Sequence, residues 1–339
     1  MCSLCGPARR WVLHLLMLEA PRSDLWQVGI VPETISRLSP ERLLALRGQI
    51  QWLPCADPWR YLADPFAVRR GSTLHVFVES FDYRDKRGVI ERHDFDLAHQ
   101  SWSGGETVLA RPFHLSYPQV FEHHGMHLML PESAQAGELA LYRSNDGLRD
   151  WRRECRLLEG PVVDGSLFHH DGRWWLFHAL LGRGARDQRE LHLASAPSLA
   201  GPWTRVGDGP LHVDPSGARP AGRPWVDAQG DVVLPVQDCS RTYGGAVRLL
   251  RVLGLGSAHC RVAPLAQRFT GDQASDTHCE GLHTLSACGE YTLIDVKRIE
   301  RSRMRQWLDL KRRARRWLAP FRSARPASAA PNRIAPTAT

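Results

Sequence analysis

Residues 162–180, with the sequence VVDGSLFHHDGRWWLFHAL, have the pattern of a β-hairpin. A first apolar strand opens on Asp164, the pair Asp171-Gly172 forms a turn, and an aromatic second strand starts at Trp174. The same pattern recurs in three segments that span the same fifteen-residue interval, 64–79, 117–132 and 280–295. A less regular copy covers 219–238. The chain therefore contains five similar hairpins, and each opens on a polar side chain.

The spacing of these hairpins predicts the fold class. They recur every 47 to about 60 residues, and repeats of about 40 to 50 residues with several short strands are typical of propeller blades. We therefore predict an all-β protein, namely a five-bladed β-propeller with a basic helical C-terminal tail. A β-sandwich built from similar hairpins is the alternative.

Composition divides the chain into four expected segments, which are a leader over 1–23, the propeller over 24–298, a basic amphipathic helix over 299–322 and a disordered tail over 323–339. The strand at 26–31 is expected to complete the last blade, because a ring closed in this way leaves no long sheet edge unpaired. Of the net charge of +8, residues 301–339 contribute +10 and the remaining 300 residues −2. We therefore do not expect the propeller to bind nucleic acid.

The cysteines and the apolar runs bear on the cellular compartment. Eight cysteines show no spacing typical of a disulfide framework, and Cys2-x-x-Cys5 lacks the second ligand pair of a zinc site. The apolar run at 11–18 has no cleavage pattern and is too short to span a bilayer. We expect reduced thiols and a cytoplasmic location, with peripheral membrane association as a further possibility.

The segment 301–322 sets apolar side chains among arginines, at Met304, Trp307, Leu308, Leu310, Trp317 and Leu318. This pattern is typical of a helix that lies on an anionic membrane surface or docks on a partner. A solvated basic tail is the alternative. A third functional hypothesis makes this tail primary, with the propeller as a platform at a membrane surface or on nucleic acid.

The residues that open the repeats are the first candidates for a site. The innermost strand of each propeller blade lines the central channel, so these residues are expected to converge at one end of it. They are Asp64, Tyr117, Asp164, Arg219 to Arg223, and Glu280. Grouped carboxyls suit glycosidic-bond chemistry, since one can stay protonated as the acid while another is ionised and activates water or attacks carbon. An Asp before Pro or Gly is also a common turn former, so each acid alone has a structural explanation.

Seven motifs together resemble the N-terminal propeller domain of the glucosamine inositolphosphorylceramide transferase family. They are Asp64-Pro-Phe, His114-Leu-Ser-Tyr-Pro, Pro131-Glu-Ser, Val163-Asp-Gly-Ser-Leu-Phe-His-His-Asp-Gly-Arg-Trp-Trp-Leu-Phe, Ala218-Arg-Pro-Ala-Gly-Arg, Gln237-Asp-Cys-Ser-Arg-Thr-Tyr-Gly-Gly-Ala-Val and Glu280-Gly-Leu-His-Thr-Leu. The resemblance runs from about Trp26 to Arg298. That domain is in turn similar to the five-bladed glycosidase superfamily of arabinanases, xylosidases and invertases.

This resemblance implies roles for particular residues. In the glycosidase superfamily an Asp that opens blade one is the base or nucleophile, an Asp that opens blade three modulates pKa values, and a Glu is the general acid. The corresponding catalytic candidates are Asp64, Asp164 and Glu280, with Glu132 as the other candidate for the acid. The candidates for substrate binding are Glu79, Tyr117, Glu132, Arg219, Arg223, Asp238, Arg241, Tyr243 and His283.

The fourth blade departs from the superfamily pattern, because Arg219 and Arg223 stand where those enzymes usually carry the acid. Guanidinium groups at this position favour an anionic ligand such as a phosphorylated or carboxylated sugar. No metal ion and no cofactor are expected.

We therefore expect a carbohydrate-active propeller that acts on or binds a glycan, a nucleotide sugar or a glycolipid headgroup, in surface polysaccharide or glycolipid metabolism. If it is an enzyme, it is expected to be glycoside hydrolase-like or associated with a glycosyltransferase. The alternative is a non-catalytic glycan-binding or scaffolding module that partners a separate glycosyltransferase.

Overall fold

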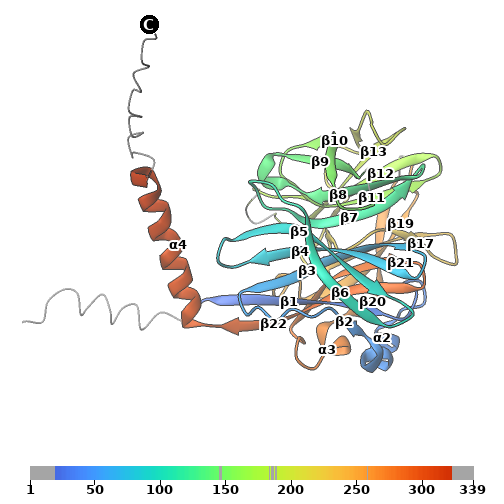
Figure 1. Cartoon of the computed structure of the whole chain (residues 1–339). Helices are drawn as coiled ribbons and strands as arrows, with labels where there is room; N and C mark the ends of the chain where they lie inside the picture. Colours follow the sequence, from blue (N-terminus) through green and yellow to red (C-terminus); the bar gives the residue numbers. More distant parts are fainter. Residues whose placement is uncertain are drawn as a thin grey trace, which may run out of the picture. The chain divides into compact units, whose positions relative to one another are not determined.

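A computed structural model of the chain describes residues 20–144, 147–182, 184, 187, 189–257 and 259–322. Five β-sheets form the blades of a five-bladed β-propeller (Figure 1), which confirms the predicted fold class. The chain divides into two units, one of them Ser23–Glu300 and the other made of Met1–Arg22 with Arg301–Thr339. Most of the predicted leader, 1–19, and the whole predicted disordered tail, 323–339, lie outside the described residues.

Four blades follow one another along the chain, and each is a sheet of four or five strands. The first comprises β3 (Arg60–Arg70), β4 (Thr73–Asp82), β5 (Arg87–Asp96) and β6 (Ser101–Leu109). The second comprises β7 (Ser116–His123), β8 (Met126–Glu132), β9 (Glu138–Ser144) and β10 (Trp151–Glu159). The third comprises β11 (Val162–His170), β12 (Arg173–Leu180), β13 (Glu190–Ala196), β14 (Thr204–Arg205) and β15 (His212–Val213). The fourth comprises β16 (Arg219–Pro220), β17 (Trp225–Val226), β18 (Val232–Asp238), β19 (Ala246–Leu253) and β20 (Arg261–Phe269).

The fifth blade is built from both ends of the propeller. Its strand order is β2-β1-β22-β21, so that β1 (Arg22–Val31) and β2 (Gln51–Trp52) complete a sheet begun by β21 (Gly281–Cys288) and β22 (Tyr291–Arg301). The closure predicted for the strand at 26–31 is therefore confirmed. Across this junction the buried Lys297 Nζ lies 3.1 Å from Asp24 Oδ2.

The short helices are α2 (Pro40–Leu46) and η1 (Arg47–Gln49) between β1 and β2, η2 (Ala134–Ala136) between β8 and β9, and α3 (Gly271–Ala274) between the fourth and fifth blades. The longest helix is α4 (Arg303–Arg322), which belongs to the other unit. Within the described part of the chain, no helix is both long and apolar enough to cross a membrane.

Apolar side chains fill the spaces between neighbouring blades. Among the described residues they form five buried clusters, and each cluster joins two adjacent sheets. In the cluster between the first two blades, for example, the rings of Phe77 and Trp151 meet edge to face at 5.6 Å. Because each blade packs on two others, the ring buries both faces of its sheets and fixes the inner strands relative to one another.

The inner strands share an irregularity that positions the site. The ladder of the first three blades is interrupted by two-residue bulges that begin at Asp64, Tyr117 and Asp164. These three residues have φ values of 52°, 47° and 50°, which non-glycine residues adopt at a cost. In the fifth blade the bulge is a single residue, His283. Bulges re-aim side chains and occur often beside functional sites.

In the fourth blade, β16 ends at Pro220 and the turn that follows contains Gly222, with φ 147°. A Cβ atom at Gly222 would lie 1.8 Å from the carbonyl oxygen of Leu285. Only glycine therefore allows the inner edges of the fourth and fifth blades to approach this closely.

Candidate functional site

Ionisable side chains from all five blades meet near the inner strands. Asp64 and Glu79 come from the first blade, and Asp295 and His283 from the fifth. We call the full set the central cluster, namely Asp64, Glu79, Glu132, Asp164, Arg219, His283 and Asp295. All seven are buried, with exposed fractions between 0% and 7%. The expected convergence of the repeat-opening residues is therefore observed for Asp64, Asp164 and Arg219.

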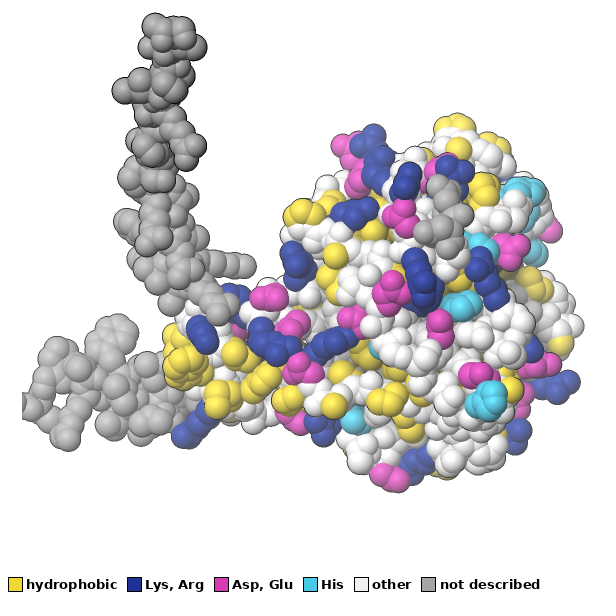
Figure 2. Space-filling view, in the orientation of Figure 1, with side chains coloured by type: hydrophobic (Ala, Val, Ile, Leu, Met, Phe, Trp, Pro, Cys, Tyr) yellow, Lys and Arg dark blue, Asp and Glu magenta, His cyan; other side chains and the backbone are white. Residues whose placement is uncertain are grey.

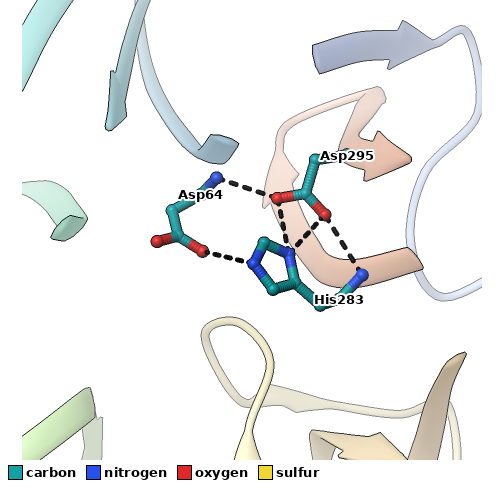
Figure 3. A group of neighbouring side chains, drawn as sticks. All are labelled: Asp64, His283 and Asp295. Atoms are coloured by element: carbon teal, nitrogen blue, oxygen red, sulfur yellow. Dashed lines mark hydrogen bonds and ion pairs between the residues drawn. The ribbon is translucent and has the colours of Figure 1, made fainter. Parts of the chain in front are cut away.

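One side of the cluster is a chain of three residues, Asp64, His283 and Asp295 (Figure 3). Asp295 accepts hydrogen bonds from the backbone N–H groups of Asp64, at 2.8 Å, and His283, at 3.2 Å. It also accepts from the backbone of Thr284, at 2.9 Å, and lies 2.7 Å from His283 Nδ1. The second ring nitrogen, His283 Nε2, lies 3.6 Å from Asp64 Oδ1. The imidazole thus bridges two carboxyls of different blades.

The remaining contacts hold Asp64 itself in place. Its carboxyl accepts hydrogen bonds from Thr284 Oγ1 and from the backbone N–H of Tyr117, both at 3.2 Å. The Tyr117 side chain packs in the core, where its hydroxyl bonds to Ser166 Oγ at 2.7 Å. Tyr117 was a candidate for substrate binding, and it contributes its backbone rather than its ring to the cluster.

These surroundings shift the acid–base behaviour of the chain. Burial raises the pKa of Asp64 to about 6, and the nearby carboxylates Asp295 and Asp164 add to the effect while His283 opposes it. Burial lowers the pKa of His283, but Asp295 and Asp64 more than offset this and leave that pKa above its ordinary value. Burial thus favours the protonated form of Asp64, and the two carboxyls beside His283 favour the protonated imidazole.

The other side of the cluster is centred on Asp164. Its carboxyl accepts two hydrogen bonds from the Arg219 guanidinium, one from Nε and one from a terminal nitrogen at 3.1 Å. Gln237 Nε2 donates a third at 2.9 Å. Asp164 is only 2% exposed and Arg219 only 7%. Arg219, which stands in blade four where an acid was expected, thus compensates the charge of Asp164 in blade three.

Two glutamates complete the cluster, and the surroundings of both favour the neutral carboxyl. Burial, reinforced by neighbouring carboxylates, raises the pKa of Glu79 and of Glu132 well above the ordinary value. Glu79 Oε1 and Glu132 Oε2 are buried without a hydrogen-bond partner among the described residues. The nearest basic groups are His114 Nε2, at 3.4 Å from Glu79, and Arg219, at 3.8 Å from Glu132. Burial lowers the pKa of His114 to about 4, so this imidazole brings no charge. The two carboxyls can act as hydrogen-bond donors or general acids.

Aromatic rings border the cluster. Trp26 stacks on His283 with ring centroids 3.7 Å apart, and Tyr243 meets the same imidazole edge-on at 5.6 Å. The Arg219 guanidinium lies 5.2 Å from the centre of the Tyr243 ring. Trp26 is buried, but Tyr243 is 36% exposed. Tyr243 is therefore the aromatic ring by which the cluster reaches the surface.

Four of the predicted site residues lie elsewhere. Glu280 is exposed, and its carboxylate accepts from the backbone N–H of Ile299, contrary to its expected convergence with Asp64 and Asp164. The prediction from the fifteen-residue interval was wrong here. The fifth hairpin has a shorter bulge than the first, and His283 occupies the position that Asp64 has in the first blade. The others are Asp238, which pairs with Arg268 at 3.2 Å, Arg223, whose guanidinium is 5.9 Å from the centre of the Phe121 ring, and the exposed Arg241.

Sequence reasoning also missed residues that build the site, namely Asp295, Trp26, Gln237 and Thr284. Asp295 ends the fifth hairpin as Glu79 and Glu132 end the first two, so the repeat itself contained the signal. Trp26 gave no such signal, because only ring closure brings β1 beside the fifth inner strand.

A metal ion would find one candidate ligand group among the described residues. Suitable atoms of Asp64, His283 and Asp295 lie within 4.8 Å of one another. Asp295, however, already accepts three backbone hydrogen bonds and contacts His283 Nδ1. Most of the candidate ligand atoms are therefore already engaged in hydrogen bonds within the protein. These bonds account for the close approach of the three side chains without a metal ion.

The propeller is similar in fold to solved glycoside hydrolases. The catalytic domain of the GH62 α-L-arabinofuranosidase from Coprinopsis cinerea superimposes with a TM-score of 0.55, covering 72% of this chain and 93% of that domain at 12% identity. A putative glycoside hydrolase from Bacteroides ovatus gives 0.51, over 70% and 87% of the two chains, also at 12% identity. At these identities the likeness concerns the fold.

Residues 53–284 match the family model "Glucosamine inositolphosphorylceramide transferase 1, N-terminal", and the chain belongs to this family. It is 34% identical over 223 residues to glucosamine inositolphosphorylceramide transferase 1 of Oryza sativa subsp. indica, covering 63% of this chain and 30% of that protein. The protein of the same name from Arabidopsis thaliana is 31% identical over 198 residues, with coverage of 58% and 26%. The chain spans less than a third of the length of these relatives.

Proposed function

We propose that the propeller is a glycan-recognition domain that binds a sugar or a glycolipid headgroup at the central cluster. The family to which it belongs supports a role connected with glycolipids, since its relatives are named as transferases of glucosamine inositolphosphorylceramide. The matched region is less than a third of those proteins, so we assign recognition to this domain and group transfer to a glycosyltransferase partner.

The polar groups of the cluster suit sugar hydroxyls, which both donate and accept hydrogen bonds. Glu79 Oε1 and Glu132 Oε2 have no hydrogen-bond partner among the described residues, and the raised pKa values of both carboxyls favour the protonated form. The partly exposed ring of Tyr243 provides an apolar surface for the face of a sugar ring beside these groups. An aromatic wall with a few convergent polar groups is the usual composition of a small-ligand site.

The observation that carries the proposal is the Arg219–Asp164 pair. A glycosidase needs an ionised carboxylate free to act and a second carboxyl ready to protonate the leaving oxygen. Here Asp164 is engaged by Arg219 and Gln237, and the fourth blade supplies a guanidinium instead of an acid. Asp64 likewise accepts two hydrogen bonds from the protein. This arrangement favours binding over hydrolysis.

Hydrolysis is the second candidate, and one observation favours it. The pKa of Glu132 is raised, one of its oxygens has no hydrogen-bond partner among the described residues, and Asp64 can ionise near pH 6. Such a pair could serve as general acid and base if a substrate reached both.

Two assays on the purified chain separate these functions. Thermal shift and calorimetry with inositol-phosphate glycans, nucleotide sugars and simple glycosides should detect binding. Tyr243→Ala should weaken it about tenfold, whereas Tyr291→Ala, at the start of β22 and outside the cluster, should not. Incubation with aryl glycosides should release no aglycone. Release that Asp64→Asn or Glu132→Gln abolishes would establish a hydrolase, and the absence of any ligand in the panel would contradict recognition of these glycans.

A further inference from the structure

The helix α4 is strongly basic, whereas the chain outside residues 301–339 carries a small net negative charge. Its twenty residues, Arg303–Arg322, include eight Lys or Arg and one Asp. The chain outside 301–339 carries a net charge of −2. Figure 2 shows Lys and Arg interspersed with Asp and Glu over the visible face of the propeller. The positive charge of this protein is therefore concentrated on one helical element.

Apolar side chains on α4 are exposed. The exposed fractions are 58% for Met304, 62% for Trp307 and 48% for Leu310. Positions three apart lie on one face of a helix, so these three side chains form one apolar stripe. Exposure of three large apolar groups in a row marks a surface that contacts something else.

Basic and aromatic groups on this helix lie close together. The Lys311 ammonium is 5.7 Å from the centre of the Trp307 ring. The acid of the helix, Asp309, is paired with Arg312 and lies 3.5 Å from Arg305. Its negative charge is thus compensated within the helix, and the surface that remains is cationic with an apolar stripe.

We propose that α4 binds the surface of a bilayer that contains anionic lipid. A helix with a basic polar face, an apolar face that includes Trp, and low overall hydrophobicity lies in the plane of the membrane interface. At 1.5 Å per residue, the backbone of the twenty-residue α4 is about 30 Å long. Anionic lipids attract the arginines, and Trp307 and its neighbours enter the headgroup region.

The positive charge of α4 would suit either a nucleic acid or an anionic bilayer. The apolar stripe favours the bilayer. Duplex nucleic acids are bound mainly through phosphate contacts, which need basic side chains but no apolar face. A bilayer uses both features of α4. This inference does not depend on the glycan site, so failure of either proposal leaves the other standing.

Co-sedimentation of the full chain with vesicles tests the proposal. Vesicles of phosphatidylcholine with about 30% phosphatidylglycerol should bind the protein, and vesicles of phosphatidylcholine alone should not. Trp307→Ala should weaken binding at least tenfold, since burial of a large apolar side chain is lost while alanine preserves the helix. Arg313→Gln should weaken it about fivefold, the ratio for one basic residue at an anionic surface, and raised salt should weaken it further.

Two variants of the propeller surface serve as matched controls. Val213→Ala removes a side chain that is 61% exposed, and Arg152→Gln removes an arginine whose side chain is 73% exposed. Neither should change vesicle binding. Circular dichroism should confirm that all four variants keep the wild-type fold.

Three results would overturn the proposal. One is no binding to anionic vesicles, and another is equal binding to neutral ones. The third is binding that Trp307→Ala leaves unchanged, because some other part of the chain would then carry it. If a nucleic acid duplex bound more tightly than vesicles and Trp307→Ala did not matter, α4 would be a nucleic-acid element instead.

Discussion

Replacement of Arg219 by methionine tests whether the guanidinium of the fourth blade holds the site together. Arg219→Met keeps much of the side-chain volume but leaves Asp164 buried, with Gln237 as its remaining side-chain donor. Removing one partner of a buried ion pair typically costs about 3–5 kcal/mol. For a domain of this size that corresponds to a melting temperature lower by roughly 6–20 °C.

A double-mutant cycle makes this prediction specific. Asp164→Asn removes the charge, and asparagine tolerates the positive φ of 50° at this position. The double variant Arg219→Met with Asp164→Asn should therefore lose less stability than the sum of the single variants, with a coupling of at least ~2 kcal/mol. Urea denaturation of the four proteins measures it. A loss below ~1 kcal/mol for Arg219→Met, or additive losses, would refute the reasoning.

Three further predictions follow from buried groups. Burial raises the pKa of Asp64 to about 6 and also raises the pKa values of Glu79 and Glu132. These carboxyls therefore stabilise the folded state fully at a pH below their pKa values in the unfolded chain. This stabilisation is lost as the pH rises through their pKa values in the folded protein. The melting temperature should thus fall between about pH 5 and pH 8, less so in Asp64→Asn, and a rise over this range would contradict the assigned shifts. Gly222→Ala should cost at least ~3 kcal/mol because its Cβ would meet a carbonyl at 1.8 Å, whereas Gly217→Ala, with its nearest contact at 3.4 Å, should be nearly neutral in the same denaturation assay. Lys297→Met should weaken ring closure at the Asp24 contact and increase proteolysis of β1, and unchanged cleavage would show that the ion pair is dispensable.

The fold was predictable because its determinants are local. Each hairpin carries its own turn signal and alternation, as at Asp171-Gly172, and five copies at one spacing leave few alternatives to a ring. Ring closure by β1 was predictable for the same reason, since an open propeller would leave edges unpaired.

The site was predictable only where the copies are alike. Asp64 and Asp164 open hairpins of the same length and do lie in the central cluster. Glu280 opens a hairpin with the same fifteen-residue interval. In the fifth blade, however, the bulge has one residue instead of two, so that His283 and not Glu280 lies in the central cluster. Bulge length depends on contacts between blades, which no local pattern encodes.

The pairing of Arg219 with Asp164 shows a second limit. From the sequence, the arginine predicts an anionic ligand, because a buried partner 55 residues away is not visible there. The structure supplies that partner within the protein itself. A charged residue at a predicted site therefore indicates the charge of a ligand only if the residue has no partner of opposite charge within the protein.

The shared fifth blade has a consequence for synthesis of the protein. Among the strands of the propeller, β1 leaves the ribosome first, but its neighbour β22 ends at Arg301. β1 therefore cannot pair with β22 until nearly the whole domain has been translated. During that time four blades can assemble while the nascent chain carries an unpaired strand at its beginning. Unpaired strand edges invite association with other chains. The interval before the ring closes is therefore the stage at which this protein is most exposed to aggregation and most dependent on chaperones.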